Sequence, residues 1–353
     1  MEPIPPDVLV RQVERLSDDL RRLTAPTDER IRELLAARPD GAVREVLLVG
    51  SGDSHHAGHA AELAFRTLGG VRCAPLSTLR FLAYGGTAPA GQDPGRVLVV
   101  GVSASGNTPL VVRALEQARQ RGSATLAVTG TPGSRLTSAA EQAVVVDVGD
   151  RERSPGIRTY QANLLALLLL AVRLGGSRDG DARVAEIASL AGLIDETLAA
   201  GRAQCGRVAG WCAAAEGAML LGSGPSYGTA LYAAAKLVEA AGIDAAGQDV
   251  EEWCHVERFI HPTEAPLFVL APPGRGHDRA AEVAQRAHEL GRRVVAVARP
   301  DDAALTAHAA AVLPVPGEVR EEFSPLVYHG FASYLAAATA QALGRAPFRS
   351  DGR

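Results

Sequence analysis

The segment Val97–Leu115 reads VLVVGVSASGNTPLVVRAL, and its order predicts a strand, a turn and a helix. The first four residues form a continuous apolar run, which is typical of a strand buried on both faces of a parallel sheet. A helix is predicted from Pro109, because the first helical N–H has no partner and proline is tolerated there. Thr108 stands at the position that caps such a helix.

The turn between these two elements, Ser103–Thr108, is rich in hydroxyl groups and contains Gly106. Where a strand leads into a helix, backbone N–H groups, hydroxyls and the positive end of the helix converge on one point. This convergence suits a phosphate dianion, but an ordinary capped turn has the same composition. The residues alone leave both interpretations open.

Similar strand-turn-helix units recur along the chain. Val46–Val49 predicts a strand that ends in Gly50–Ser54 and leads into a helix through about Thr67. Strands alternating with helices favour a parallel α/β sheet, whose ligands bind at the carboxyl ends of the strands. The other expected elements are helical residues 1–40 and 158–174, and strands at 125–128, 144–146 and 219–221.

Landmarks recur at a nearly constant offset, which indicates a duplicated domain. Ser226 closes a turn like that of Ser54 and lies 172 positions after it, and Ser324 follows Ser154 by 170, each before a proline. Two similar doubly wound α/β domains are therefore predicted. The counterpart of the hydroxyl-rich turn reads Pro273–His277 and has no serine or threonine, so the phosphate is expected in the first copy only.

Bulk properties exclude several classes of protein. In 353 residues the net charge is −4, and no basic cluster with interleaved aromatic residues suggests nucleic acid binding. The apolar run at 164–172 is too short to span a bilayer, so no membrane association is expected. The amino terminus lacks the design of a signal peptide, which favours the cytoplasm. The four cysteines form no CxxC pair, and neither a cofactor nor a metal is expected.

The turn residues resemble the sugar isomerase (SIS) domain family, and more narrowly the isomerase half of glucosamine-6-phosphate synthase and the fructosamine-6-phosphate deglycases. The family motif S-x-S-G-x-T is matched from Ser103 to Thr108. The resemblance implies two tandem flavodoxin-like SIS domains and a bound sugar phosphate. It implies phosphate binding by Ser54, Ser103, Ser105 and Thr108, with possible substrate contacts from Gly52, Ala104 and Asn107.

The second half carries the more specific part of this resemblance. In the synthase a lysine precedes the catalytic glutamate by three residues, and a ring-opening histidine follows it by sixteen. Lys236, Glu239 and His255 have this spacing, and Lys236 is the only lysine in the chain. The resemblance implies that Glu239 moves a proton between C1 and C2, that Lys236 assists, and that His255 opens the sugar ring. It also implies a homodimer, because relatives take this histidine from the neighbouring subunit.

From the residues alone, other interpretations of this half remain. Lys236 and Glu239, one helical turn apart, are also the pattern of a surface salt bridge. His255, in the run Glu251–His255, is also typical of a histidine held by neighbouring carboxylates.

Further candidates are less specific. The resemblance places Arg158 and Tyr160 in a loop that lines the sugar, and Arg349 in a tail that closes the site. For Arg158 and Tyr160, packing or a surface salt bridge is an equal alternative. His55 and His59 have the spacing of a metal pair, but without a third ligand they are interpreted as surface or substrate-edge histidines. Glu321 and Glu322 are interpreted as helix-start acids.

Two departures narrow the expected chemistry. The tail has no lysine that could form an imine, and no glutaminase-like segment precedes the first domain. We expect a phosphosugar isomerase, deaminase or deglycase working through an enediol or enolamine; the alternative is a non-catalytic sugar-phosphate-binding regulator. The expected domains are a helical segment (1–40), a first SIS domain (41–175), a helical connector (176–215), a second SIS domain (216–345) and a tail (346–353).

Overall fold

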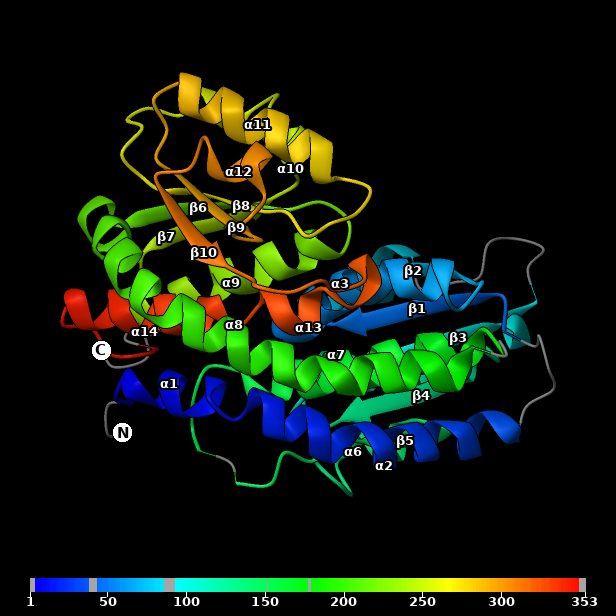
Figure 1. Cartoon of the computed structure of the whole chain (residues 1–353). Helices are drawn as coiled ribbons and strands as arrows, with labels where there is room; N and C mark the ends of the chain where they lie inside the picture. Colours follow the sequence, from blue (N-terminus) through cyan, green and yellow to red (C-terminus); the bar gives the residue numbers. More distant parts are fainter. Residues whose placement is uncertain (1–3, 38–42, 86–92, 151, 177–178, 349–353) are drawn as a thin grey trace. The chain divides into compact units, whose positions relative to one another are not determined.

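The computed structural model describes residues 4–37, 43–85, 93–150, 152–176 and 179–348 (Figure 1). The chain divides into two compact units, each with its own sheet. The first-sheet unit comprises Asp18–Arg151 and Arg158–Ser189, and the second-sheet unit comprises Met1–Ser17, Glu152–Ile157 and Leu190–Arg353. The domain boundaries expected from the sequence remain a prediction.

The first-sheet unit contains a five-stranded parallel sheet of order β2-β1-β3-β4-β5. This is the flavodoxin-like order, in which β2 lies on one side of β1 and the later strands on the other. The strand order therefore reverses between β1 and β3. The prediction of a strand at Val97 is confirmed, and that strand continues to Val102. The strands are β1 (Glu45–Gly50), β2 (Arg72–Ser77), β3 (Val97–Val102), β4 (Ala124–Thr129) and β5 (Gln142–Val145).

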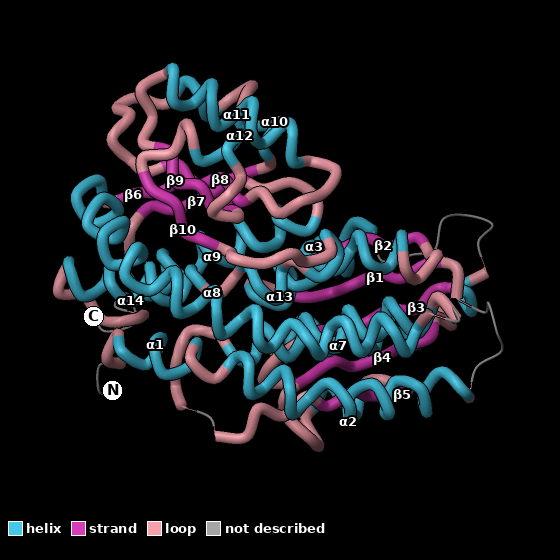
Figure 2. The backbone as a smooth tube through the Cα atoms, in the orientation of Figure 1, coloured by secondary structure: helices cyan, strands magenta, loops and turns pink. Residues whose placement is uncertain are grey.

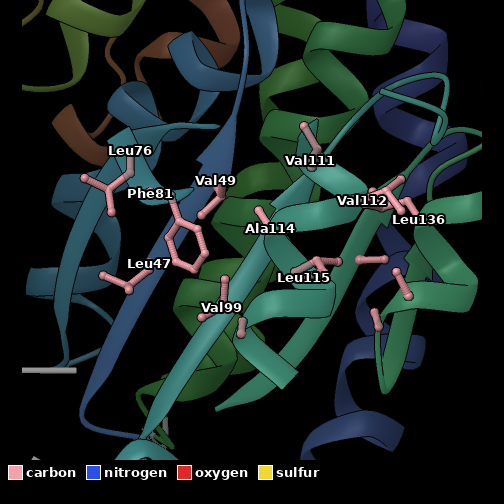
Figure 3. Packing of buried hydrophobic residues seen from close by; sticks show 14 of the residues in the cluster. Leu47, Val49, Leu76, Phe81, Val99, Val111, Val112, Ala114, Leu115 and Leu136 are labelled. Carbon is pink, nitrogen blue, oxygen red and sulfur yellow. The ribbon is translucent and has the colours of Figure 1, made fainter. Parts of the chain in front are cut away.

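Both faces of this sheet are covered, which explains why β3 and β4 are buried along their whole length. Alternate residues of a strand point to opposite faces. Leu47, Val49 and Val99 point to one face and pack with Phe81 and with helix α5 (Figure 3). On the other side, α3 packs against α7. The helices here are α2 (Leu16–Ala36), α3 (Asp53–Thr67), α4 (Thr78–Arg80), α5 (Pro109–Gln120), α6 (Arg135–Ala139) and α7 (Arg158–Leu174).

The second-sheet unit repeats the same design (Figure 2). Its parallel sheet has the order β10-β9-β8-β6-β7, so the first strand again lies between the second and the third. Val269 packs on one face with α11 and with Trp253, whereas Phe268 stacks on Phe331 of α14 with ring centroids 6.1 Å apart. The strands are β6 (Gly217–Leu221), β7 (Asp244–Gln248), β8 (Leu267–Leu270), β9 (Val294–Ala298) and β10 (Ala311–Pro314).

The remaining helices complete this unit, apart from the first part of α8, which belongs to the first-sheet unit. They are α1 (Asp7–Val13), α8 (Gly180–Ala215), α9 (Pro225–Ala241), α10 (Val250–Trp253), α11 (His277–Glu289), α12 (Ala303–Thr306), α13 (Pro325–Tyr328) and α14 (Phe331–Ala342). Within the residues that the structure describes, no helix is both long and apolar enough to cross a membrane.

The prediction of an α/β protein with parallel sheets is confirmed. The shared strand order of the two sheets supports the duplication, which remains a proposal. One expectation is wrong: Arg158 and Tyr160 do not lie in a loop, because α7 begins at Arg158 and both side chains are buried.

Candidate functional site

The two turns singled out from the sequence meet at the switch point of the first sheet. β1 and β3 are hydrogen-bonded neighbours, with Val49 opposite Gly101. Because both strands are parallel, the turn after β1 and the turn after β3 lie at the same edge of the sheet. Ligands of open α/β sheets bind at this edge, beside the strands where the order reverses.

The turn after β3 is held by its own hydroxyl groups. The hydroxyls of Ser103 and Thr108 share a hydrogen bond of 2.9 Å, and Gly106 N–H donates to the carbonyl of Ser103 at 3.0 Å. Thr108 occupies the N-cap position of α5, but its side chain does not cap the helix as expected. The Thr108 hydroxyl is hydrogen-bonded to the buried hydroxyl of Ser103 instead.

Ser105 and Asn107 form the tip of this turn, and both are exposed. The N–H of Asn107 donates to the Ser105 hydroxyl oxygen at 3.2 Å, and its side-chain amide donates to the Ser105 carbonyl at 3.0 Å. The carbonyl of Ala104 accepts the N–H of Gly130 at 3.1 Å. Asn107 and Ala104 therefore fix the turn, while the Ser105 hydroxyl lies at its surface.

The turn after β1 is shaped by Gly52, whose φ is +53°, a value that favours glycine. Ser54 follows in the first turn of α3 and is half-buried. Ser51 shares a hydrogen bond of 2.8 Å with Thr78, which ties this turn to the end of β2. Asp53 adds a carboxylate at the start of α3, and His56 Nδ1 lies 3.8 Å from it.

His55 and His59 lie on the same helix with ring centroids 4.6 Å apart. Burial, followed by the charge of Arg80, lowers the pKa of His55, and burial with the neighbouring histidines lowers the pKa of His59 to about 4. The two rings are half-buried rather than on the surface. In the part of the chain that is described, no group of three or more His, Cys, Asp and Glu side chains could hold a metal ion.

Lys236 and Glu239 lie on α9 of the second-sheet unit and form an ion pair of 2.5 Å. Lys236 is completely buried, whereas the Glu239 side chain is 31% exposed. The Tyr232 ring centroid lies 5.1 Å from the lysine Nζ, close enough for a cation–π interaction. The alternative of a surface salt bridge does not describe this pair, because its cation is removed from solvent.

Lys236 and Glu239 do not lie at the carboxyl ends of the strands, where ligands of parallel α/β sheets are expected. In a parallel sheet each helix runs back toward the amino ends of the strands, and Glu239 lies near the end of α9, shortly before β7 begins. The pair is therefore remote from the turn at which α9 starts. The carbonyl of Glu239 accepts the N–H of Phe348 at 2.7 Å, so the end of the described chain lies against it.

His255 follows α10 and is exposed, with 66% of its side chain accessible. Its Nε2 lies 3.0 Å from Glu251, which matches the interpretation of a histidine held by a neighbouring carboxylate. The pKa of Glu251 is lowered, first by a hydrogen bond from Arg279 and then by the one from His255. An exposed imidazole remains available to a partner molecule.

Arg158 does not have the environment of a substrate-binding group. Its guanidinium is buried and donates to Asp19 at 2.5 and 2.8 Å and to the carbonyls of Val148 and Asp150. Hydrogen bonding to Asp19 is the main reason that the pKa of Arg158 is raised. These contacts favour the packing alternative. Arg349 lies outside the described residues.

Sequence reasoning missed the contacts made by the turn after β8, at the β6/β8 switch point of the second-sheet unit. Glu321 belongs to a short 3₁₀ turn, as an acid at its start, but its carboxylate also binds Arg275 in the turn after β8. His277 Nε2 lies 2.5 Å from Asp302. Burial lowers the pKa of His277, but the hydrogen bonds and charges of Asp302 and Asp278 together outweigh burial and raise it. Neither pair has a signal in local sequence spacing.

The first-sheet unit, which carries the switch-point turns, matches a known domain family. Residues 42–173 match the family model of the SIS domain. The match includes both turns at the β1/β3 switch point.

The chain is 28% identical over 290 residues to the isomerizing glutamine–fructose-6-phosphate aminotransferase of Methanothermobacter thermautotrophicus, covering 82% of the chain and 47% of that protein. It is 31% identical over 241 residues to the protein of the same name from Gloeobacter violaceus, covering 66% and 39%. The chain therefore spans less than half the length of these relatives.

A solved structure shares the fold of nearly the whole chain. The C-terminal domain of glucosamine-fructose-6-phosphate aminotransferase from Francisella tularensis superposes with a TM-score of 0.83. The alignment covers 96% of the chain and 97% of that structure at 16% identity, so it is a likeness of fold alone.

Proposed function

We propose that the protein is a phosphosugar-processing enzyme that transfers a proton between C1 and C2 of a keto- or amino-sugar phosphate. The observation that carries the proposal is the hydroxyl-lined turn at the β1/β3 switch point, within the part of the chain that matches the SIS domain. The relatives named as isomerizing fructose-6-phosphate aminotransferases support a phosphorylated sugar as substrate.

In this proposal the first-sheet unit binds the phosphate ester. Ser105 at the tip of the turn and Ser54 at the start of α3 supply hydroxyl donors, together with Ser103 and Thr108 behind them. The start of α5 adds the positive end of a twelve-residue helix. Gly52, Ala104 and Asn107 hold the backbone around the ester.

The second-sheet unit supplies the acid–base groups. Glu239 takes a proton from the carbon beside the carbonyl, the C–H electron pair forms a C=C bond, and the carbonyl π pair passes to the oxygen. The product is an enediolate, which becomes the enediol when its oxygen takes a proton from solvent; an amino sugar that reacts as its imine gives the enolamine in the same way. The same carboxylate returns the proton to the neighbouring carbon. Lys236 stabilises the developing negative charge, and its burial strengthens this interaction because water does not screen it.

Ring opening is assigned to His255, because an imidazole can both donate and accept a proton. Its exposure agrees with a role across a homodimer interface, in which one subunit's imidazole reaches the partner's sugar. Isomerisation, deamination and deglycation share these steps and differ mainly in the group that leaves.

The test is proton exchange with solvent. The full chain is incubated in heavy water with fructose 6-phosphate, glucosamine 6-phosphate and a fructosamine 6-phosphate, and deuterium at C1 and C2 is followed by NMR. Deuterium is expected in at least one phosphorylated sugar and in none of the matching unphosphorylated sugars. A non-catalytic regulator would bind a sugar phosphate without exchange, and that result would contradict the proposed activity.

A further inference from the structure

The second-sheet unit has a switch point of its own, between β6 and β8. Leu221 lies opposite Val269, so the turn after β6 and the turn after β8 are at the same edge. This is the place that corresponds to the phosphate-binding turn proposed for the first-sheet unit. Its backbone also leads into a long helix, α11, which begins at His277.

A carboxylate of the protein is bound at this turn. Arg275 N–H donates to Glu321 Oε1 at 3.2 Å, and the Arg275 guanidinium donates to Oε2 at 2.6 Å. The Glu321 side chain is only 14% exposed, although Arg275 is 62% exposed. The turn therefore binds a negative group through the backbone and side chain of the same residue.

Glycine at position 274 lets the carboxylate approach this closely. A Cβ atom added to Gly274 would lie 2.4 Å from Glu321 Cδ and 2.8 Å from its Oε1. Both distances are far below ordinary contact. The side chain of Glu321 thus fills the space that a residue larger than glycine, or a ligand, would need.

Little space remains beside the carboxylate on the side of Ser223 and Ser226. The adjoining cavity has a volume of about 10 Å³, and its lining includes Ser223, Ser226, Gly276, His277 and Glu321. A cavity of about 10–15 Å³ holds no more than one water molecule. A phosphate group cannot enter this cavity while Glu321 is in place.

We infer that Glu321 is an internal anion that occupies the second switch point and closes it to phosphate esters. The backbone N–H of the turn and the start of α11 favour a negative group here, and the chain supplies that group itself. The closure stands on these contacts alone. It follows that each chain binds one phosphate ester, at the first-sheet turn. This corollary rests on the proposed function of that turn.

The experiment opens the closed site and counts bound anions. Glu322 lies 3.7 Å from the Arg275 guanidinium and could replace its neighbour, so it must be neutralised as well. The opened variant is Glu321→Ala with Glu322→Gln. The control is Glu321→Gln with Glu322→Gln, which has the same charge but keeps a side chain of the same volume in the turn.

Inorganic phosphate bound per full-length chain is measured by equilibrium dialysis with radiolabelled phosphate. The wild type and the control are expected to bind one phosphate and the opened variant two. Counts of zero, zero and one would support the closure and contradict the phosphate turn of the first-sheet unit. Two phosphates on the wild type, or equal counts on the opened variant and its control, would overturn the inference.

A second variant covers the case in which the opened variant does not fold. Glu321→Ser with Glu322→Gln also takes the carboxylate out of the space beside Gly274, and serine leaves a short polar side chain at the start of the 3₁₀ turn. This variant is expected to bind one phosphate more than the control, and an equal count in a folded chain contradicts the inference.

Discussion

The N–H of Phe348 donates a hydrogen bond of 2.7 Å to the carbonyl oxygen of Glu239. Arg345, three residues earlier, donates to the carbonyl of Ala241 at 3.0 Å and to the carboxylate of Glu216 at 2.7 Å. The segment from Arg345 to Phe348, where the tail begins, is therefore fixed to the end of α9, beside the residue proposed as the base. Phe348 has a φ of +58°, an unusual value for a residue other than glycine.

Phe348→Pro should impair the proposed exchange reaction, because proline has no N–H and cannot adopt a positive φ. Loss of one hydrogen bond of about 1 kcal/mol corresponds to a decrease in kcat/KM of roughly fivefold. Phe348→Gly is the control, since glycine keeps the N–H and accepts this φ. Exchange rates from heavy-water NMR should fall in the first variant and stay within about twofold in the second. Equal losses would assign the effect to the phenyl ring.

Two glycines give a matched test of the phosphate turn. Gly106 and Gly133 have nearly the same φ, +64° and +63°, so alanine strains the backbone equally at both. A Cβ atom at Gly106 would lie 2.1 Å from Ser134 Oγ, whereas a Cβ atom at Gly133 would have no neighbouring atom within 4 Å. Gly106→Ala should therefore raise KM for the sugar phosphate by about tenfold or more, the equivalent of 1.4 kcal/mol of distortion. Gly133→Ala should leave KM near the wild-type value; a similar rise in both would exclude a special role for the turn.

Much of the first switch point was predictable because its signals are local. An apolar run, a glycine among hydroxyls and a proline at the first helical position lie within a dozen residues, and each has a direct physical cause. Thr108 occupies the predicted N-cap position, but its side chain makes no capping hydrogen bond, because it is hydrogen-bonded to a second hydroxyl, that of Ser103.

Interactions between distant parts of the chain were not predictable. Arg158 and Asp19 are 139 positions apart, and Arg275 and Glu321 are 46 apart. Helical spacing brought Lys236 and Glu239 together correctly, but spacing does not indicate burial. The rarity of lysine in this chain was the one hint that Lys236 is not an ordinary surface cation.

Arg158→Met should destabilise the protein without a direct effect on the substrate. The change leaves the carboxylate of Asp19 buried and without its main counter-charge, which costs about 3–5 kcal/mol in comparable buried pairs. Arg21→Met is the control, because Arg21 pairs with an exposed Asp18 and such pairs contribute about 0–1 kcal/mol. Urea unfolding measures both changes. A raised KM with unchanged stability would instead favour the substrate contact.

His329 should make the protein sensitive to acid. It is completely buried beside Tyr232, and burial lowers its pKa to about 3. The unfolded chain binds a proton near pH 6.5 and the folded chain does not, so stability is lost as the pH falls from about 6.5 toward 3. His329→Phe should remove this loss. The free energy of unfolding of the variant relative to the wild type should change by about 2 kcal/mol between pH 7 and pH 5; a constant difference would mean that His329 is not buried in its neutral form.

The central claim is that Glu239 moves the substrate proton while a separate turn holds the phosphate ester. Its most direct test is the heavy-water exchange rate of Glu239→Gln, measured at saturating sugar phosphate with binding followed in parallel. The account predicts that deuterium incorporation at C1 and C2 is abolished while the sugar phosphate still binds. Exchange at the wild-type rate in this variant would contradict it.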